Sequence, residues 1–262
     1  MNTALVIARN TISEALRKKI INAFFMVGVV LIGLTFIFNQ FSPRQELTLV
    51  KGMGLGIISL AGLLITVILS INLIPTEIER RTIYTILAKP VRRNEFLLGK
   101  FLGSVGTLTI NIGLMGVVFV AAIAVKQMGS DSAINPFLLL KGILMIFMQL
   151  VLLSALAIFF STFVTPLVNF FLTMVVFVIG NLSTYTQNLA QNSKVLPVKW
   201  FLSALHYGLP NFANFQYTNP LLQPDVQVQN EAQFLATNCV YAVVYATALL
   251  FLAIFAFDRR EV

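Results

Sequence analysis

Residues 75–104, PTEIERRTIYTILAKPVRRNEFLLGKFLGS, hold a dense group of charged side chains between two long apolar runs. The apolar run before this stretch covers residues 57–74, and the run after it covers residues 101–125. A charged, amphipathic segment between two runs of membrane length must lie at a membrane surface. We therefore expect another molecule to bind there and to move the two flanking spans.

The composition indicates an integral membrane protein with little soluble mass. Of the 262 residues, 58% are hydrophobic and 11% are charged, whereas soluble domains contain about 25% charged residues. The net charge of +8 is explained by Lys and Arg beside membrane spans, so we expect no nucleic acid among the partners. The first apolar run follows a charged lead of 19 residues and is long enough to span, which argues against a cleavable signal peptide.

Six apolar runs are long enough to cross a membrane as helices, because about 20 apolar residues cross about 30 Å of hydrocarbon. Continuous runs of this length differ from the alternating strands of a barrel, so we expect an all-α fold in one transmembrane domain, residues 1–262. The connection at residues 161–166 is so short that the fourth and fifth spans should be adjacent and antiparallel. The expected spans are residues 20–38, 53–74, 101–125, 138–160, 163–183 and 234–257.

The distribution of basic residues predicts that both termini are cytoplasmic. An even number of spans places both termini on the same side of the membrane. If that side is cytoplasmic, twelve Lys and Arg residues lie inside and six lie outside, which is the bias of the positive-inside rule. The six outside are Arg44, Lys51, Lys126, Lys141, Lys194 and Lys199.

Two further segments are expected to form helices at the membrane surface. Residues 1–19 predict an interfacial helix with its apolar face toward lipid and its basic residues toward headgroups; a disordered basic tail is the alternative. In the outer loop, residues 184–231, aromatic and apolar residues predict a short re-entrant or interfacial helix, with Pro197 near its start and Gly208–Pro210 at its end. The rest of this loop is polar and could meet a substrate or an extracytoplasmic partner. The apolar face of the N-terminal helix comprises Leu5, Ala8, Ile12, Ala15 and Leu16.

The charged segment, residues 75–100, begins with the pattern of a short amphipathic helix parallel to the membrane. Pro75 suits a helix start, and Glu77 and Glu79 lie in the first turn, where carboxylates favour the helix dipole. Pro90 ends the helix, because a residue before proline disfavours the α conformation. An ordinary positive-inside loop would explain the charges but not the apolar stripe between the two prolines. That stripe comprises Ile83, Ile86 and Leu87, with Thr82, Tyr84 and Thr85 around it.

A basic corner, Arg92 and Arg93, connects this helix to the third span. We expect the chain to turn into that span at Gly99–Lys100. Glycines spaced four residues apart permit close approach of helices in lipid, either within the chain or at a dimer interface. The pairs with this spacing are Gly52/Gly56 and Gly99/Gly103.

The sequence offers no catalytic or metal site. Gly99–Lys100 is followed by Phe101 and lacks the upstream glycine of a phosphate loop, so we expect no ATP site in this chain. His206 is the only histidine, which rules out an all-histidine metal site; it could relay protons, contact a ligand or serve as an interfacial polar residue. Cys239, the only cysteine, is interpreted as an inert core thiol. The spans lack ionisable residues near their centres, which argues against an ion-coupled carrier. Their neutral polar residues favour a lipidic, amphipathic or hydrophobic cargo over a small ion.

This combination of features resembles the membrane subunits of type-2 ABC exporters. In that family a cytoplasmic coupling helix between the second and third spans rests in a cleft of a separate ATPase subunit. The resemblance covers the whole chain, because the family also has an interfacial N-terminal helix, six spans and helical structure in the outer loop before the last span. The signature in this chain reads Glu77-Ile-Glu79-Arg-Arg-Thr82-Ile83-Tyr84-Thr-Ile86-Leu87-Ala-Lys89-Pro90-Val91-Arg92-Arg93, then Phe96-Leu-Leu-Gly99-Lys100.

The resemblance implies an ATP-driven exporter of two permeases, as a homodimer, and two ATPases in a bacterial or archaeal cell membrane. The ATPase would bind ATP and Mg²⁺, so this chain would carry no cofactor and no enzymatic activity of its own. Gly99 and Lys100 would form the hinge that passes movement into the third span. A non-transporting membrane anchor or scaffold that recruits a cytosolic protein is the alternative, because a docking helix serves either purpose. The residues implied in ATPase docking are Glu77, Glu79, Thr82, Ile83, Tyr84, Ile86, Leu87, Lys89, Pro90, Arg92 and Arg93.

Overall fold

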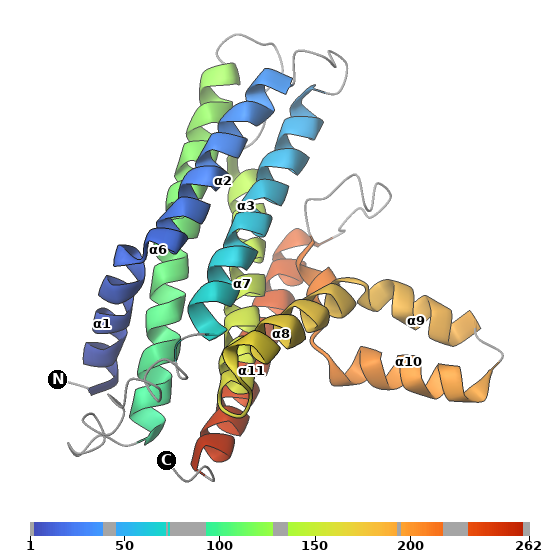
Figure 1. Ribbon diagram of the computed structural model, residues 1–262. Helices are drawn as coiled ribbons and strands as arrows, with labels where there is room; N and C mark the ends of the chain where they lie inside the picture. Colours follow the sequence, from blue (N-terminus) through green and yellow to red (C-terminus); the bar gives the residue numbers. More distant parts are fainter. Residues whose placement is uncertain are drawn as a thin grey trace.

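Every regular element in the described part of the chain is a helix, which confirms the all-α prediction (Figure 1). The computed structural model describes residues 3–38, 46–71, 73, 93–127, 136–192, 195–216 and 230–258. The α-helices are α1 (Thr3–Arg17), α2 (Lys19–Phe38), α3 (Glu46–Ile71), α6 (Arg93–Gln127), α7 (Pro136–Ser161), α8 (Pro166–Asn181), α9 (Ser183–Asn192), α10 (Leu196–Gly208) and α11 (Glu231–Asp258); η2 (Phe212–Phe215) is a 3₁₀ helix.

Four of these helices are long and apolar enough to cross a membrane, among the residues described: α3, α6, α7 and α11. Two further pairs meet the same criteria together but are bent, α1 with α2 by 65° and α8 with α9 by 62°, so up to six spans are present if each pair is one span. The chain is therefore a multi-pass membrane protein. The predicted fifth span, 163–183, corresponds to α8, which has only 16 residues and reaches spanning length only with α9.

Helix α7 lies at the centre of the bundle. It contacts α3, α6, α8 and α11, and Figure 1 shows α1 and α2 on one side of it and the α8–α10 arm on the other. Apolar residues occur on all sides of α7, as expected of a helix that is largely buried in the bundle. Leu152, Leu153 and Ile158 of α7 are fully buried.

Three buried serines join α7 to its neighbours α3 and α6. The Oγ atom of Ser154 lies 3.2 Å from that of Ser70 and 2.9 Å from that of Ser104, and the Ser70 and Ser104 hydroxyls are 3.4 Å apart. Small residues let helix backbones approach closely in lipid, and their hydroxyls can bond across the contact. This hydroxyl triangle therefore connects the last turns of α3 to the first half of α6.

The prediction that the fourth and fifth spans are adjacent is confirmed. Helix α7 ends at Ser161 and α8 begins at Pro166. The buried Asn169 amide donates a hydrogen bond to the Ala157 carbonyl at 2.9 Å, and its oxygen accepts one from the Thr173 hydroxyl at 2.9 Å. A polar side chain inside the bundle thus bonds the two helices directly.

The arm beyond α8 contains one helix more than the sequence predicts. Helix α10 begins beside Pro197 and ends at Gly208, as expected, whereas α9 falls in the predicted loop. The two helices contact each other and run in opposite directions (Figure 1). Ser183 Oγ and His206 Nδ1 lie 2.8 Å apart, so the histidine bonds the end of α10 to the start of α9. The re-entrant or interfacial position of α10 stays a prediction.

Candidate functional site

Most of the predicted docking residues lie outside the described part of the chain. Three of the residues implied in docking or hinge movement do have a described position, namely Arg93, Gly99 and Lys100, all in α6. The residues outside the described ranges are Glu77, Glu79, Thr82, Ile83, Tyr84, Ile86, Leu87, Lys89, Pro90 and Arg92.

The two helices that flank the charged segment are in contact with each other. Helix α3 ends at Ile71, and α6 begins at Arg93. The two helices pack together, and the Ser70–Ser104 contact lies in the last turn of α3 and about three turns into α6. The candidate docking segment therefore connects two helices that pack against each other.

The predicted turn at Gly99–Lys100 is wrong, because α6 runs without a break from Arg93 to Gln127. Glu95 lies in the first turn of this helix, where a carboxylate favours the helix dipole. No proline interrupts the sequence after that turn, so glycine alone does not end the helix. The entry into the third span therefore lies at Arg93, and a hinge at Gly99 and Lys100 stays a prediction.

Helix α1 packs into a groove of glycines on α6. A Cβ atom added at Gly99 would lie 2.8 Å from the Ala4 carbonyl oxygen, and one at Gly103 would lie 2.5 Å from the Thr11 Cβ atom. At Gly106 the added Cβ would lie 2.6 Å from the Ile12 Cδ1 atom. These separations are shorter than van der Waals contact. A side chain at Gly99 or Gly103 would therefore force the α1 backbone to shift, whereas at Gly106 the end of the Ile12 side chain could move aside. The Gly99/Gly103 pair therefore serves packing within the chain.

The apolar face of α1 contacts protein in part, which corrects the prediction that this face lies toward lipid. Ala8 and Ala15 of the predicted face are buried, as is Thr11 between them. Leu5 and Leu16 of that face remain exposed. The physical reason is the glycine groove, because a backbone without side chains lets α1 approach closely and buries its small residues.

Arg93 has partners at the far end of the chain. Its Nη1 donates a hydrogen bond to the Phe257 carbonyl at 3.1 Å, and its guanidinium lies 5.7 Å from the centre of the Phe257 ring. A cation at a helix C-terminus satisfies a free carbonyl and favours the helix dipole. Arg93 therefore bonds the start of α6 to the last turn of α11. Sequence reasoning missed this contact because 164 residues separate the partners.

Lys100 is buried beside an aromatic ring rather than exposed at a surface. Only 5% of the residue is exposed, and its Nζ lies 5.8 Å from the centre of the Phe96 ring. A cation within about 6 Å of a ring centre is attracted to the ring face. Phe96 in turn stacks on Phe257 at 6.3 Å. The basic residues at the start of α6 thus contribute to packing within the chain.

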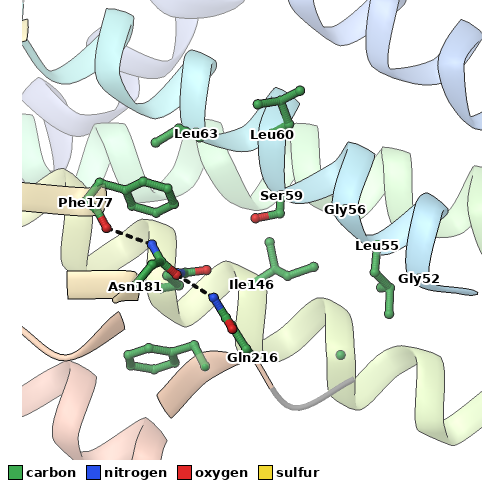
Figure 2. Close-up of a pocket in the computed structure, with 13 residues that line it drawn as sticks. Gly52, Leu55, Gly56, Ser59, Leu60, Leu63, Ile146, Phe177, Asn181 and Gln216 are labelled. Carbon is green, nitrogen blue, oxygen red and sulfur yellow. Dashed lines mark hydrogen bonds between the residues drawn. The ribbon is translucent and has the colours of Figure 1, made fainter. Parts of the chain in front are cut away.

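A cavity of about 250 Å³ lies between α3, α7, α8 and η2. Figure 2 shows Ser59 and Leu60 of α3 on one side of it and Asn181 and Gln216 on the other. Gly56, the second glycine of the Gly52/Gly56 pair, also lines it, and nothing lies within 4 Å of a Cβ added there. Gly56 therefore borders open space instead of a helix contact.

Comparison with known families identifies the chain. It matches the model of a family described as "ABC-2 family transporter protein" over residues 4–262, and no curated protein matches it. Members of this family are membrane components of ABC transporters, are not catalytic themselves and generally pair with an ABC ATPase. In the described ranges no three His, Cys, Asp or Glu side chains gather as a metal site requires. The chain belongs to the ABC-2 family of transporter proteins and is a permease subunit of an ABC transporter.

Proposed function

We propose that this permease docks a separate ATPase through residues 75–92 and forms an export path with a second copy of itself. The observation that carries the proposal is the position of this charged segment between two contacting helices, α3 and α6, in a chain of the ABC-2 family. ATP and Mg²⁺ bind to the ATPase, since this chain carries no phosphate loop.

Each part of the segment has a chemical role in docking. Glu77 and Glu79 orient the coupling helix at its positive end. The apolar side chains of Ile83, Ile86 and Leu87 fill the ATPase cleft in the manner of an amphipathic helix in a groove. The residues around them complete the contact: Thr82, Tyr84, Lys89 and Pro90 at its edge, and Arg92 toward acidic groups or headgroups.

The arrangement of the helix ends supports a common cytoplasmic side for docking and for both termini. Figure 1 places the start of α1, the start of α6 and the end of α11 at the same end of the bundle. The Arg93 bond to Phe257 fixes two of these ends to each other. The basic residues of segment 75–92 adjoin the start of α6 in the sequence, so we infer from the positive-inside rule that this end faces the cytoplasm of a bacterial or archaeal cell.

The docking test replaces two residues of the apolar stripe by aspartate. Ile83→Asp with Leu87→Asp should abolish co-purification of the ATPase and the permease-stimulated part of its ATP hydrolysis, because charges cannot enter an apolar cleft. Ile83→Leu with Leu87→Ile is the matched control, since it changes the same positions but keeps them apolar, and it should retain both signals.

Two outcomes contradict the proposal. Unchanged ATPase binding and stimulated hydrolysis in the aspartate variant would show that docking lies elsewhere. Association through this segment with a protein that binds no nucleotide would favour the scaffold alternative instead.

A further inference from the structure

The cavity between α3, α7, α8 and η2 contains a cluster of three amides. Gln149 of α7 is 4% exposed, and its Nε2 donates to Asn181 Oδ1 at 3.1 Å. The Nε2 of Gln216, which follows η2, donates to the same oxygen at 2.8 Å, as drawn in Figure 2. Asn181 in turn donates from Nδ2 to the Phe177 carbonyl at 2.8 Å. The three amides therefore form one connected group.

The hydrogen bonds determine the partners of the NH₂ group and of the oxygen atom in each amide. The Phe177 carbonyl can only accept, so Asn181 must present its NH₂ group to it and its oxygen to the two glutamines. Both glutamines must then donate to Asn181. Their Oε1 atoms accept no hydrogen bond from the residues that the structure describes, although both side chains line the cavity. Gln149 is buried and Gln216 is half-buried. Because a buried acceptor without a donor is costly, the Gln149 oxygen favours a donor from outside the protein.

The rest of the lining restricts the ligand to an uncharged group. Among the residues that the structure describes, none that lines the cavity carries a charge. An ion would lose its hydration there without a counter-charge. Leu63, Ile146 and Phe215 add buried apolar walls.

The opening and the volume indicate an amphiphile. Gly56 and Leu60, which are exposed, lie on α3 within its apolar span, so the cavity opens toward hydrocarbon or a neighbouring span. The volume of about 250 Å³ is below the about 300–1,000 Å³ of sites for drug-sized ligands. It fits the polar end of a ligand whose apolar chain stays outside.

We propose that this cavity binds the uncharged, hydrogen-bond-donating end of an amphiphile, such as a hydroxyl or amide headgroup, through Gln149 and Gln216. The identification of that amphiphile as transported cargo rests on the proposed function. Binding itself requires only the permease.

The binding test uses the full-length permease in lipid nanodiscs and a photoreactive monoacylglycerol as probe. The probe should cross-link to peptides from α3 or α8 at the cavity. A fatty acid anion and an alkyltrimethylammonium of the same chain length should label the cavity at least tenfold less. Gln149→Leu should weaken monoacylglycerol binding about tenfold, the effect of one lost hydrogen bond in a dry site.

A second variant keeps the test decisive if Gln149→Leu fails to fold. Gly56→Leu places a side chain in the open space of the cavity and should abolish cross-linking. Gly113→Leu is the matched control, since Gly113 also has nothing within 4 Å of an added Cβ but does not line the cavity. It should leave cross-linking unchanged.

The proposal is overturned if Gly56→Leu leaves labelling intact, if the charged probes label equally, or if cross-links map outside the cavity. A cross-link between two permease copies at Gly56 would also overturn it, because the cavity would then be part of the dimer contact. Monoacylglycerol should still bind to the Ile83→Asp, Leu87→Asp permease, in which ATPase docking is disrupted. Binding to this variant would show that the cavity site does not depend on ATPase docking. If monoacylglycerol stimulates ATP hydrolysis by the wild-type complex but not by the Gly56→Leu complex, the amphiphile is cargo. Binding without stimulation would identify a resident lipid, which overturns the assignment as cargo but not the binding site.

Discussion

Gly103→Ala should push α1 away from α6. A Cβ atom at this position would lie 2.5 Å from the Thr11 Cβ atom and 3.0 Å from the Ala8 carbonyl oxygen. Neither neighbour is the flexible end of a long side chain, so the α1 backbone must shift. Thr11 and Ala8 are both buried, and a shift would expose them.

The magnitude follows from comparison with Gly113→Ala in the same helix. Both substitutions gain about 1 kcal/mol of helix propensity. Gly113 has nothing within 4 Å of an added Cβ, so its substitution should keep this gain. Gly103→Ala adds the cost of overpacking, about 1–3 kcal/mol. The difference between the two variants in free energy of unfolding should therefore be about 1–3 kcal/mol, with Gly103→Ala the less stable.

Two measurements check this expectation. Denaturant titration in detergent micelles compares the free energies of unfolding of the two variants. Ala8→Cys, in a Cys239→Ser background, then reports on α1 itself, because the introduced thiol should react slowly with a maleimide while α1 is docked and faster in Gly103→Ala. Equal stability of the two glycine variants, together with equal protection of the thiol, would refute the packing of α1 on the glycine groove.

Two other substitutions test contacts between helices. Asn169→Leu should lower the free energy of unfolding by about 0.5–2 kcal/mol in the same titration, because it removes the amide that bonds α7 to α8. Thr247→Val, at an exposed threonine that bonds only within α11, should lower it by less than about 0.5 kcal/mol. Equal losses in the two variants would contradict a bonding role for Asn169. Arg93→Lys should cost about 1 kcal/mol although the charge is kept, since a planar guanidinium both stacks on Phe257 and bonds its carbonyl. Exposed Arg17→Lys should be neutral, and a neutral Arg93→Lys would show that charge alone matters.

Local patterns were sufficient to predict most of the helices and several of their ends. Apolar runs of spanning length gave α3, α6, α7 and α11, because spanning helices must satisfy their backbone groups internally. Pro197 and Gly208 marked the ends of α10, and the short connection after Ser161 predicted the α7–α8 contact. Helix α9 was missed because its sequence, STYTQNLAQN, is polar and resembles a loop.

The contacts that build the site were beyond prediction because they depend on the tertiary arrangement. An apolar helix face looks the same whether it contacts lipid or protein, so the packing of α1 on α6 could not be distinguished from an interfacial position. Gly99 suggested a turn, since glycine is a poor helix former, and only its contact with α1 explains why glycine is needed inside the helix. The amides of Gln149, Asn181 and Gln216 come from different elements, and no spacing in the sequence brings them together.

The proposed coupling must act on a helix whose first turns are held by both ends of the chain. Helix α1 packs along the glycines of α6, and Arg93 bonds α6 to the last turn of α11. Since α6 is continuous through Gly99, a force applied at residues 75–92 would displace its start together with both partners rather than bend it at that glycine. Such a displacement would also reach the hydroxyl triangle of Ser70, Ser104 and Ser154, about three turns into α6. Neutral hydroxyl contacts can exchange partners at little cost compared with ion pairs, so such a contact would yield readily if the proposed coupling displaced α6.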